Sequence, residues 1–136
     1  MPTRACWGYD NRFGLVRVPP ERGAATRVEM RLADGSANPY LATAALLFAG
    51  LDGIRRELTP PPAVAGLVYE LPEEEQGDPI PHTLDAALEA LEADALLRDA
   101  MGAQLVDTFL TIKRFELERY HHHVSDWDLA EYAHHL

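Results

Sequence analysis

Three ionisable side chains recur at every second position of one short segment, namely Arg27, Glu29 and Arg31. Alternate side chains of a β-strand lie on one face, so two guanidinium groups are expected to flank one carboxylate. Such a group could bind phosphate or carboxylate through its arginines and a divalent cation, Mg²⁺ or Mn²⁺, through Glu29. The intervening apolar residues are then expected to face a core: Val28, Met30 and Leu32.

The same spacing also fits a structural ion-pair ladder, and spacing alone does not decide between the two interpretations. Arg12 and Arg17, in the preceding segment, could add phosphate contacts. They are five positions apart, which places them on opposite faces of a regular strand. Both reach the site only if a bulge intervenes, for which Gly14 is the candidate, or if Arg12 precedes the regular strand. One glutamate is an incomplete Mg²⁺ site, so further ligands must come from elsewhere.

Composition narrows the class of protein. The chain has 136 residues, 47% of them hydrophobic, and its single cysteine, Cys6, suits a reducing cytoplasm. The net charge of -10 argues against general nucleic-acid binding. The first 31 residues nevertheless carry six arginines against three acidic side chains, which suggests a local anion site. No signal peptide is evident, and the longest apolar run is shorter than the roughly 20 residues of a membrane span.

The predicted fold class is α+β, an antiparallel β-hairpin packed by helices within a single domain over residues 1–136. The hairpin that carries the site covers residues 1–34. It combines a strand at Trp7–Pro19 with a strand at Thr26–Leu32.

Helices are predicted to follow this hairpin. Asn38 is a suitable N-cap and Pro39 a favoured first residue for a helix over residues 38–58. This helix is apolar on all sides in its first three turns, so we expect it to be buried. An acidic, proline-rich loop over residues 66–82 leads to a helical tail over residues 83–136. The longest tail helix has one predicted core face: Leu105, Val106, Phe109, Leu110, Ile112 and Phe115.

Two ordered motifs resemble a known family. The stretches "DNRFGLVRVP" and "RVEMRLADGSANPYLATAALLFAGLDGI" resemble the C-terminal part of the glutamine synthetase catalytic domain. Weaker similarity continues through "IPHTLDAALEALEAD" and "KRFELERYHHHVSDWDLAEY". The sequence "RLADGSANPYL" and the C-terminal stretch suggest a less typical branch of this family, one that uses another amine in place of ammonia.

The resemblance implies an ATP-dependent ligase of glutamine biosynthesis and nitrogen metabolism. Such enzymes transfer the γ-phosphate of ATP to the γ-carboxylate of glutamate, and ammonia or an amine then attacks the acyl phosphate. Arg12, Arg17 and Arg27 correspond to arginines near the transferred and nucleotide phosphates, with Arg12 the catalytic one. Arg31 corresponds to the arginine that pairs with glutamate. Glu29 corresponds to a ligand of the catalytic Mg²⁺ or Mn²⁺, since arginines and metal together stabilise the charge of phosphoryl transfer.

The resemblance also implies that the site is shared. The family's other metal carboxylates, ammonia-side acid and nucleotide pocket precede this segment, and neighbouring subunits of a homo-oligomeric ring complete each site. The chain alone is therefore expected to be inactive, and a regulatory or assembly module derived from the family remains the alternative. Tyr69 resembles a tyrosine that some bacterial members modify, but an ordinary loop-packing role is the preferred interpretation, because the same short motif occurs in unregulated members. Which amine is accepted does not follow from these residues.

Overall fold

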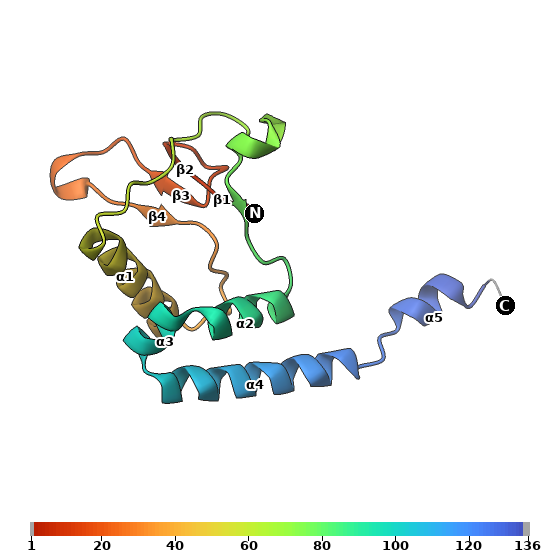
Figure 1. Ribbon diagram of the computed structural model, residues 1–136. Coiled ribbons are helices and arrows are strands. Elements are labelled where there is room, and N and C mark those ends of the chain that lie inside the picture. The colour runs from red at the N-terminus through yellow and green to blue at the C-terminus, as the bar shows by residue number, and fades with distance from the viewer. Residues whose placement is uncertain (1, 135–136) are drawn as a thin grey trace. The chain divides into compact units, whose positions relative to one another are not determined.

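The computed structural model describes residues 2–134 and separates into two compact units (Figure 1). One unit covers Met1–His82 and the other Thr83–Leu136. Each unit has its own small cluster of buried apolar side chains. The sequence had indicated one domain over residues 1–136, and the division falls at the predicted border between the acidic loop and the helical tail.

The first unit contains short strands in two sheets. Strand β2 (Trp7–Tyr9) pairs in parallel with β3 (Val16–Val18), and β3 pairs in antiparallel fashion with β4 (Glu29–Met30). Strand β1 (Arg4–Ala5) pairs with β5 (Asp78–Pro79) in a separate antiparallel sheet. The α+β class and the antiparallel pairing within residues 1–34 are confirmed.

The predicted continuous strand Trp7–Pro19 is wrong, because the chain leaves β2, loops back and forms a second strand, β3, that runs parallel to β2. Asp10 has φ = 49°, a left-handed conformation that ends β2. The six residues that follow Tyr9 form a loop and return the chain beside its own start, so that Trp7 lies opposite Val16. Gly14 in this loop would bring an added Cβ only within ordinary contact distance of Cys6 and Trp7.

A small core holds the acidic loop against the sheet region. Cys6, Val64 and Val68 are buried together, and Leu71 packs against them. The loop contains the 3₁₀ turns η2 (Val68–Glu70) and η3 (Glu73–Glu75), while η1 (Gly23–Ala25) lies between β3 and β4. The loop is thus mostly exposed, as predicted, but Val68 anchors it.

Helix α1 (Pro39–Arg55) starts where its capping residues predict. The Asn38 side chain accepts hydrogen bonds from the backbone N–H groups of Tyr40 and Leu41, at 3.0 and 3.2 Å. The expected burial is not observed, because no residue of α1 is buried by the described part of the chain. Four of its large apolar side chains are exposed: Leu46, Leu47, Leu51 and Ile54.

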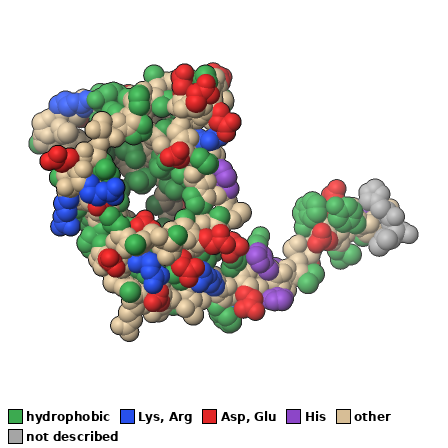
Figure 2. Space-filling model, in the orientation of Figure 1, with side chains coloured by type: hydrophobic (Ala, Val, Ile, Leu, Met, Phe, Trp, Pro, Cys, Tyr) green, Lys and Arg blue, Asp and Glu red, His purple; other side chains and the backbone are tan. Residues whose placement is uncertain are grey.

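The apolar side chains of the charged segment are exposed as well. Val28, Met30 and Leu32 retain 62%, 40% and 36% of their accessible surface, so the prediction that they face a core is wrong for this chain. The physical reason is that β4 is an edge strand of only two residues, over which none of residues 2–134 forms a covering layer. Figure 2 shows many such apolar side chains, in green, at the surface.

The second unit is helical, as predicted. It comprises α2 (Leu84–Ala93), α3 (Ala95–Met101), α4 (Ala103–His121) and α5 (Trp127–Tyr132). Its core consists of Leu88 from α2 with Val106 and Leu110 from α4, each 2% exposed.

The predicted core face of α4 is only partly correct. Val106 and Leu110 are buried and Phe109 packs against them, whereas the others are exposed: Leu105, Ile112 and Phe115. A helix packed on one side can bury only a narrow stripe. No helix among residues 2–134 is both long and apolar enough to cross a membrane.

The small helical core gives a stability prediction. Leu110→Ala should destabilise the second unit by about 2–3 kcal/mol, because it leaves a cavity in a cluster of few residues. Leu105→Ala, on the same helix at 46% exposure, should cost no more than about 0.5 kcal/mol. Urea unfolding followed by far-ultraviolet circular dichroism measures both. Equal losses would contradict the assignment of this core.

Candidate functional site

The charged side chains of β3 and β4 meet at one pair of opposed residues. Arg17 lies directly across from Glu29 in the antiparallel register. Its Nη1 donates to Glu29 Oε2 at 2.6 Å. Arg27 approaches the other carboxylate oxygen, Oε1, with Nη2 at 3.0 Å and Nε at 3.1 Å. Glu29 is therefore flanked by two guanidinium groups, as predicted, but one of them belongs to Arg17 and not to Arg31.

These contacts shift the pKa values of Glu29 and Arg17. The hydrogen bond from Arg17 is the main reason why the pKa of Glu29 lies below its ordinary value of 4.5, and the bond from Arg27 adds to it. The pKa of Arg17 is raised, first by its hydrogen bond to Asp10 and next by that to Glu29. The Arg17 side chain is 12% exposed and that of Glu29 is 29% exposed. Both groups thus remain ionised in a partly buried site that water and ligands can reach.

The other two predicted arginines line a neighbouring pocket. Arg12 lies in the loop before β3, which settles the problem of the five-residue spacing without a bulge. Arg31 donates from Nε to the backbone oxygen of Arg12 at 3.1 Å. The pocket has a volume of about 350 Å³. Its lining residues are Pro2, Thr3, Arg12, Phe13, Arg31, Val68, Tyr69 and Gln76.

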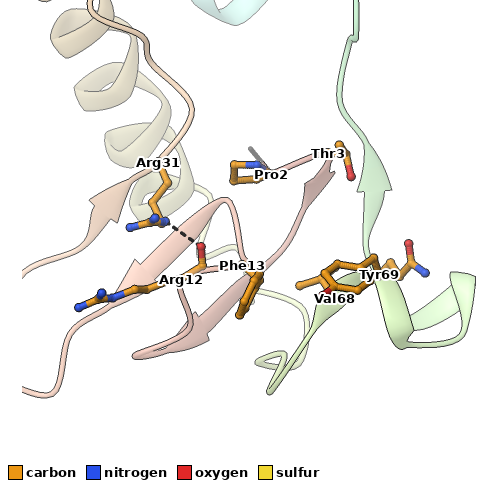
Figure 3. A pocket seen from close by; sticks show the side chains of 8 residues that line it. Pro2, Thr3, Arg12, Phe13, Arg31, Val68 and Tyr69 are labelled. Carbon is orange, nitrogen blue, oxygen red and sulfur yellow. Dashed lines mark hydrogen bonds between the residues drawn. The ribbon is translucent and has the colours of Figure 1, made fainter.

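The pocket has a cationic side and an apolar side (Figure 3). Arg12 and Arg31 lie on one side, Val68 and Tyr69 on the other, and Phe13 lies between them. The rings of Phe13 and Tyr69 pack edge to face, with centroids 6.2 Å apart. A small molecule with an anionic end fits such a pocket. Tyr69 is 67% exposed, and the suggestion that it is modified stays a prediction.

One residue of the site region escaped the sequence analysis. Asn11 is 7% exposed, and its Nδ2 donates to the backbone oxygens of Val64 and Gly66 at 2.9 and 3.1 Å. Its Oδ1 accepts from the N–H of Phe13 at 2.9 Å. Asn11 thereby ties the loop that carries Arg12 to a segment more than fifty residues away. Asparagine is common in loops, so its type gave no signal of this role.

A metal site is not complete among residues 2–134, which the structure describes. Both oxygens of Glu29 accept hydrogen bonds from arginines. The two further carboxylates of this group are also bound to the same arginines, Asp10 to Arg17 and Glu21 to Arg27. The described residues contain no group of three or more His, Cys, Asp or Glu side chains placed to hold a metal ion. A single carboxylate supplies too few oxygen ligands for a divalent cation, so the predicted binding of Mg²⁺ or Mn²⁺ by Glu29 stays a prediction.

The fold and the site together define an α+β module. It presents four arginines around Glu29 and an adjoining pocket. The family model "Glutamine synthetase, catalytic domain" matches residues 1–132. The chain therefore belongs to the glutamine synthetase family, and the resemblance noted from its motifs is confirmed.

Individual relatives agree with this assignment. The chain is 39% identical to the glutamine synthetase of Methanocaldococcus jannaschii and 40% identical to that of Thermus thermophilus. Each match covers 96% of this chain and 30% of the relative. A solved structure described as "Apo GmaS without ligand" is 37% identical, with a TM-score of 0.80 over 93% of this chain and 29% of that one. The chain thus spans about a third of the length of these proteins.

The Asn11 contacts predict a selective loss of stability. Asn11→Asp should destabilise the first unit by about 2 kcal/mol or more, because a carboxylate cannot donate to the two carbonyl oxygens and is repelled by them. Asn38→Asp is the matched control, since the helix cap needs only an accepting oxygen. Thermal unfolding compares the two variants. A control as unstable as Asn11→Asp would contradict the proposed tie.

The ion pairs of Glu29 predict a pH dependence. Folding lowers the pKa of Glu29, so its ionised pairs stabilise the fold above pH 4.5 and this contribution is lost as the pH falls through the lowered value. A ¹³C NMR titration should give a midpoint below 4.5. Arg17→Ala should raise that midpoint more than Arg27→Ala, because the Arg17 hydrogen bond is the stronger cause. Arg114→Ala, which unpairs Glu92 in the second unit, should leave it unchanged.

Proposed function

We propose that this chain supplies part of the active site of an ATP-dependent ligase that joins glutamate to ammonia or to another amine. The observation that carries the proposal is the grouping of Arg17 and Arg27 around Glu29, next to a pocket lined by Arg12 and Arg31. Membership of the glutamine synthetase family supports the same chemistry.

Each charged residue has a proposed role. Arg17 and Arg27 bind the phosphates of ATP, and Arg12 binds and stabilises the phosphoryl group during its transfer. Fixed guanidinium groups suit this task because negative charge spreads over the phosphoryl oxygens in the transition state. Arg31, in the pocket, pairs with a carboxylate of glutamate.

Glu29 is proposed to bind Mg²⁺ or Mn²⁺ through one carboxylate oxygen. Such a cation neutralises phosphate oxygens during phosphoryl transfer. For this, Glu29 must give up one of its arginine contacts, and an arginine released in this way would be free to bind phosphate. The remaining ligands are proposed to lie in the rest of the protein and in neighbouring subunits of a homo-oligomeric ring. The chain by itself is accordingly proposed to be inactive.

A second candidate is a regulatory or assembly module without catalysis. Helix α1 favours it, because a helix with four exposed large apolar side chains needs a partner surface. The two candidates differ in nucleotide binding, because a module that only joins subunits together has no need of arginines that bind phosphate.

Isothermal titration of the full-length protein with Mg-ATP separates the candidates. Arg27→Ala should raise the Kd about tenfold or more, because charge-assisted hydrogen bonds to phosphate are lost. Arg98→Ala, which breaks an exposed ion pair with Asp107 in the second unit, is the control and should bind as the parent does. Absence of heat with the parent protein would leave only the assembly role.

A further inference from the structure

Asp10 contacts the same arginine that pairs with Glu29, from the opposite side. Its Oδ1 accepts from Arg17 Nε at 3.0 Å and, in a short contact, from Arg17 Nη2. One carboxylate oxygen thus bridges the side edge of the guanidinium group. Asp10 has none of the phosphate, glutamate or metal roles proposed for the four arginines and Glu29.

The contact with Asp10 leaves some N–H groups of Arg17 available to a ligand. A guanidinium group has five N–H bonds. Asp10 takes one on Nε and one on Nη2, and Glu29 takes one on Nη1. One N–H on Nη1 and one on Nη2 have no partner among the described residues. These two are the donors that Arg17 can offer to a ligand.

The backbone conformation of Asp10 is fixed independently of this contact. Asp10 ends β2 in a left-handed conformation, φ = 49°, which aspartate and asparagine tolerate better than most residues. Its N–H donates to the backbone oxygen of Val18 at 2.9 Å, and Val18 is the neighbour of Arg17 on β3. Carboxylate and guanidinium are therefore held by the same pair of strands.

Without Asp10, Arg17 has a competing arrangement. Arginine readily binds one carboxylate with two parallel N–H bonds, and Glu29 lies within 2.6 Å. Such a closed pair would consume one more donor of Arg17 and the Glu29 oxygen that now faces Arg27. The negative charge of Asp10 repels a bound phosphate. The Asp10 side chain is 58% exposed, however, so water and salt screen this repulsion.

We propose that Asp10 is a positioning residue, which holds Arg17 so that one N–H on each terminal nitrogen points to a phosphate of ATP. This rests on the proposed function, in which Arg17 binds nucleotide phosphate. The expected consequence is selective: Asp10 matters for the phosphate chain of the nucleotide and not for its nucleoside part.

The test uses the full-length protein and measures Kd by isothermal titration for Mg-ATP and for adenosine. Asp10→Asn keeps the shape and tolerates the backbone conformation but removes the charge. This variant should raise the Kd for Mg-ATP about tenfold and leave the Kd for adenosine unchanged. Asp10→Glu restores the charge and should stay within about threefold of the parent. Asp107→Asn is the matched control, because Asp107 pairs with Arg98 in the second unit at 2.7 Å.

Four results would overturn the proposal. They are ATP binding by Asp10→Asn equal to the parent, an equal loss for adenosine, a loss in Asp10→Glu as large as in Asp10→Asn, and an added loss when Asp10→Asn is combined with Arg17→Ala. Arg17→Ala alone separates the two levels. If it binds ATP normally, the proposed role of Arg17 fails. If it binds weakly while Asp10→Asn does not, only the positioning role fails.

Discussion

The ion pair between Arg17 on β3 and Glu29 on β4, which lie directly across from each other, is the constraint on which the candidate site depends. These strands have three and two residues, so few backbone hydrogen bonds define their register. A slip of one residue would move Arg17 to the other face of the sheet. The ion pair itself therefore helps to keep the register that creates it, and Arg27 reinforces it by occupying the second oxygen of Glu29.

Around this pair the first unit is held by long-range contacts more than by a large core. Asn11 ties the loop before β3 to Val64 and Gly66, and Cys6 and Val68 pack nearby. Such a unit can place charged groups precisely while burying little apolar surface. The exposed apolar side chains of α1 and β4 agree with a chain that matches only about a third of the length of its relatives.

Much of the local structure could be predicted from sequence. Asn38 and Pro39 predict the start of α1 because helix caps depend only on neighbouring residues. The antiparallel pairing of the Arg17 and Glu29 segments follows from their composition and proximity. The break at Asp10 was missed, because a left-handed backbone at a residue other than glycine leaves no clear pattern. The exposure of Val28 and Met30 was missed too, since alternation predicts which face is apolar but not whether anything covers it.

The sequence by itself determined the family, the helices and the residue types of the site, since ordered motifs and local capping survive without any knowledge of packing. Only the tertiary structure decided that Glu29 lies between Arg17 and Arg27 and that Arg31 turns to the loop of Arg12. The reason is physical. An arginine side chain has several rotatable bonds and can reach acceptors in many directions, so its partner depends on strand register, on the conformation of Asp10 and on contacts between distant segments.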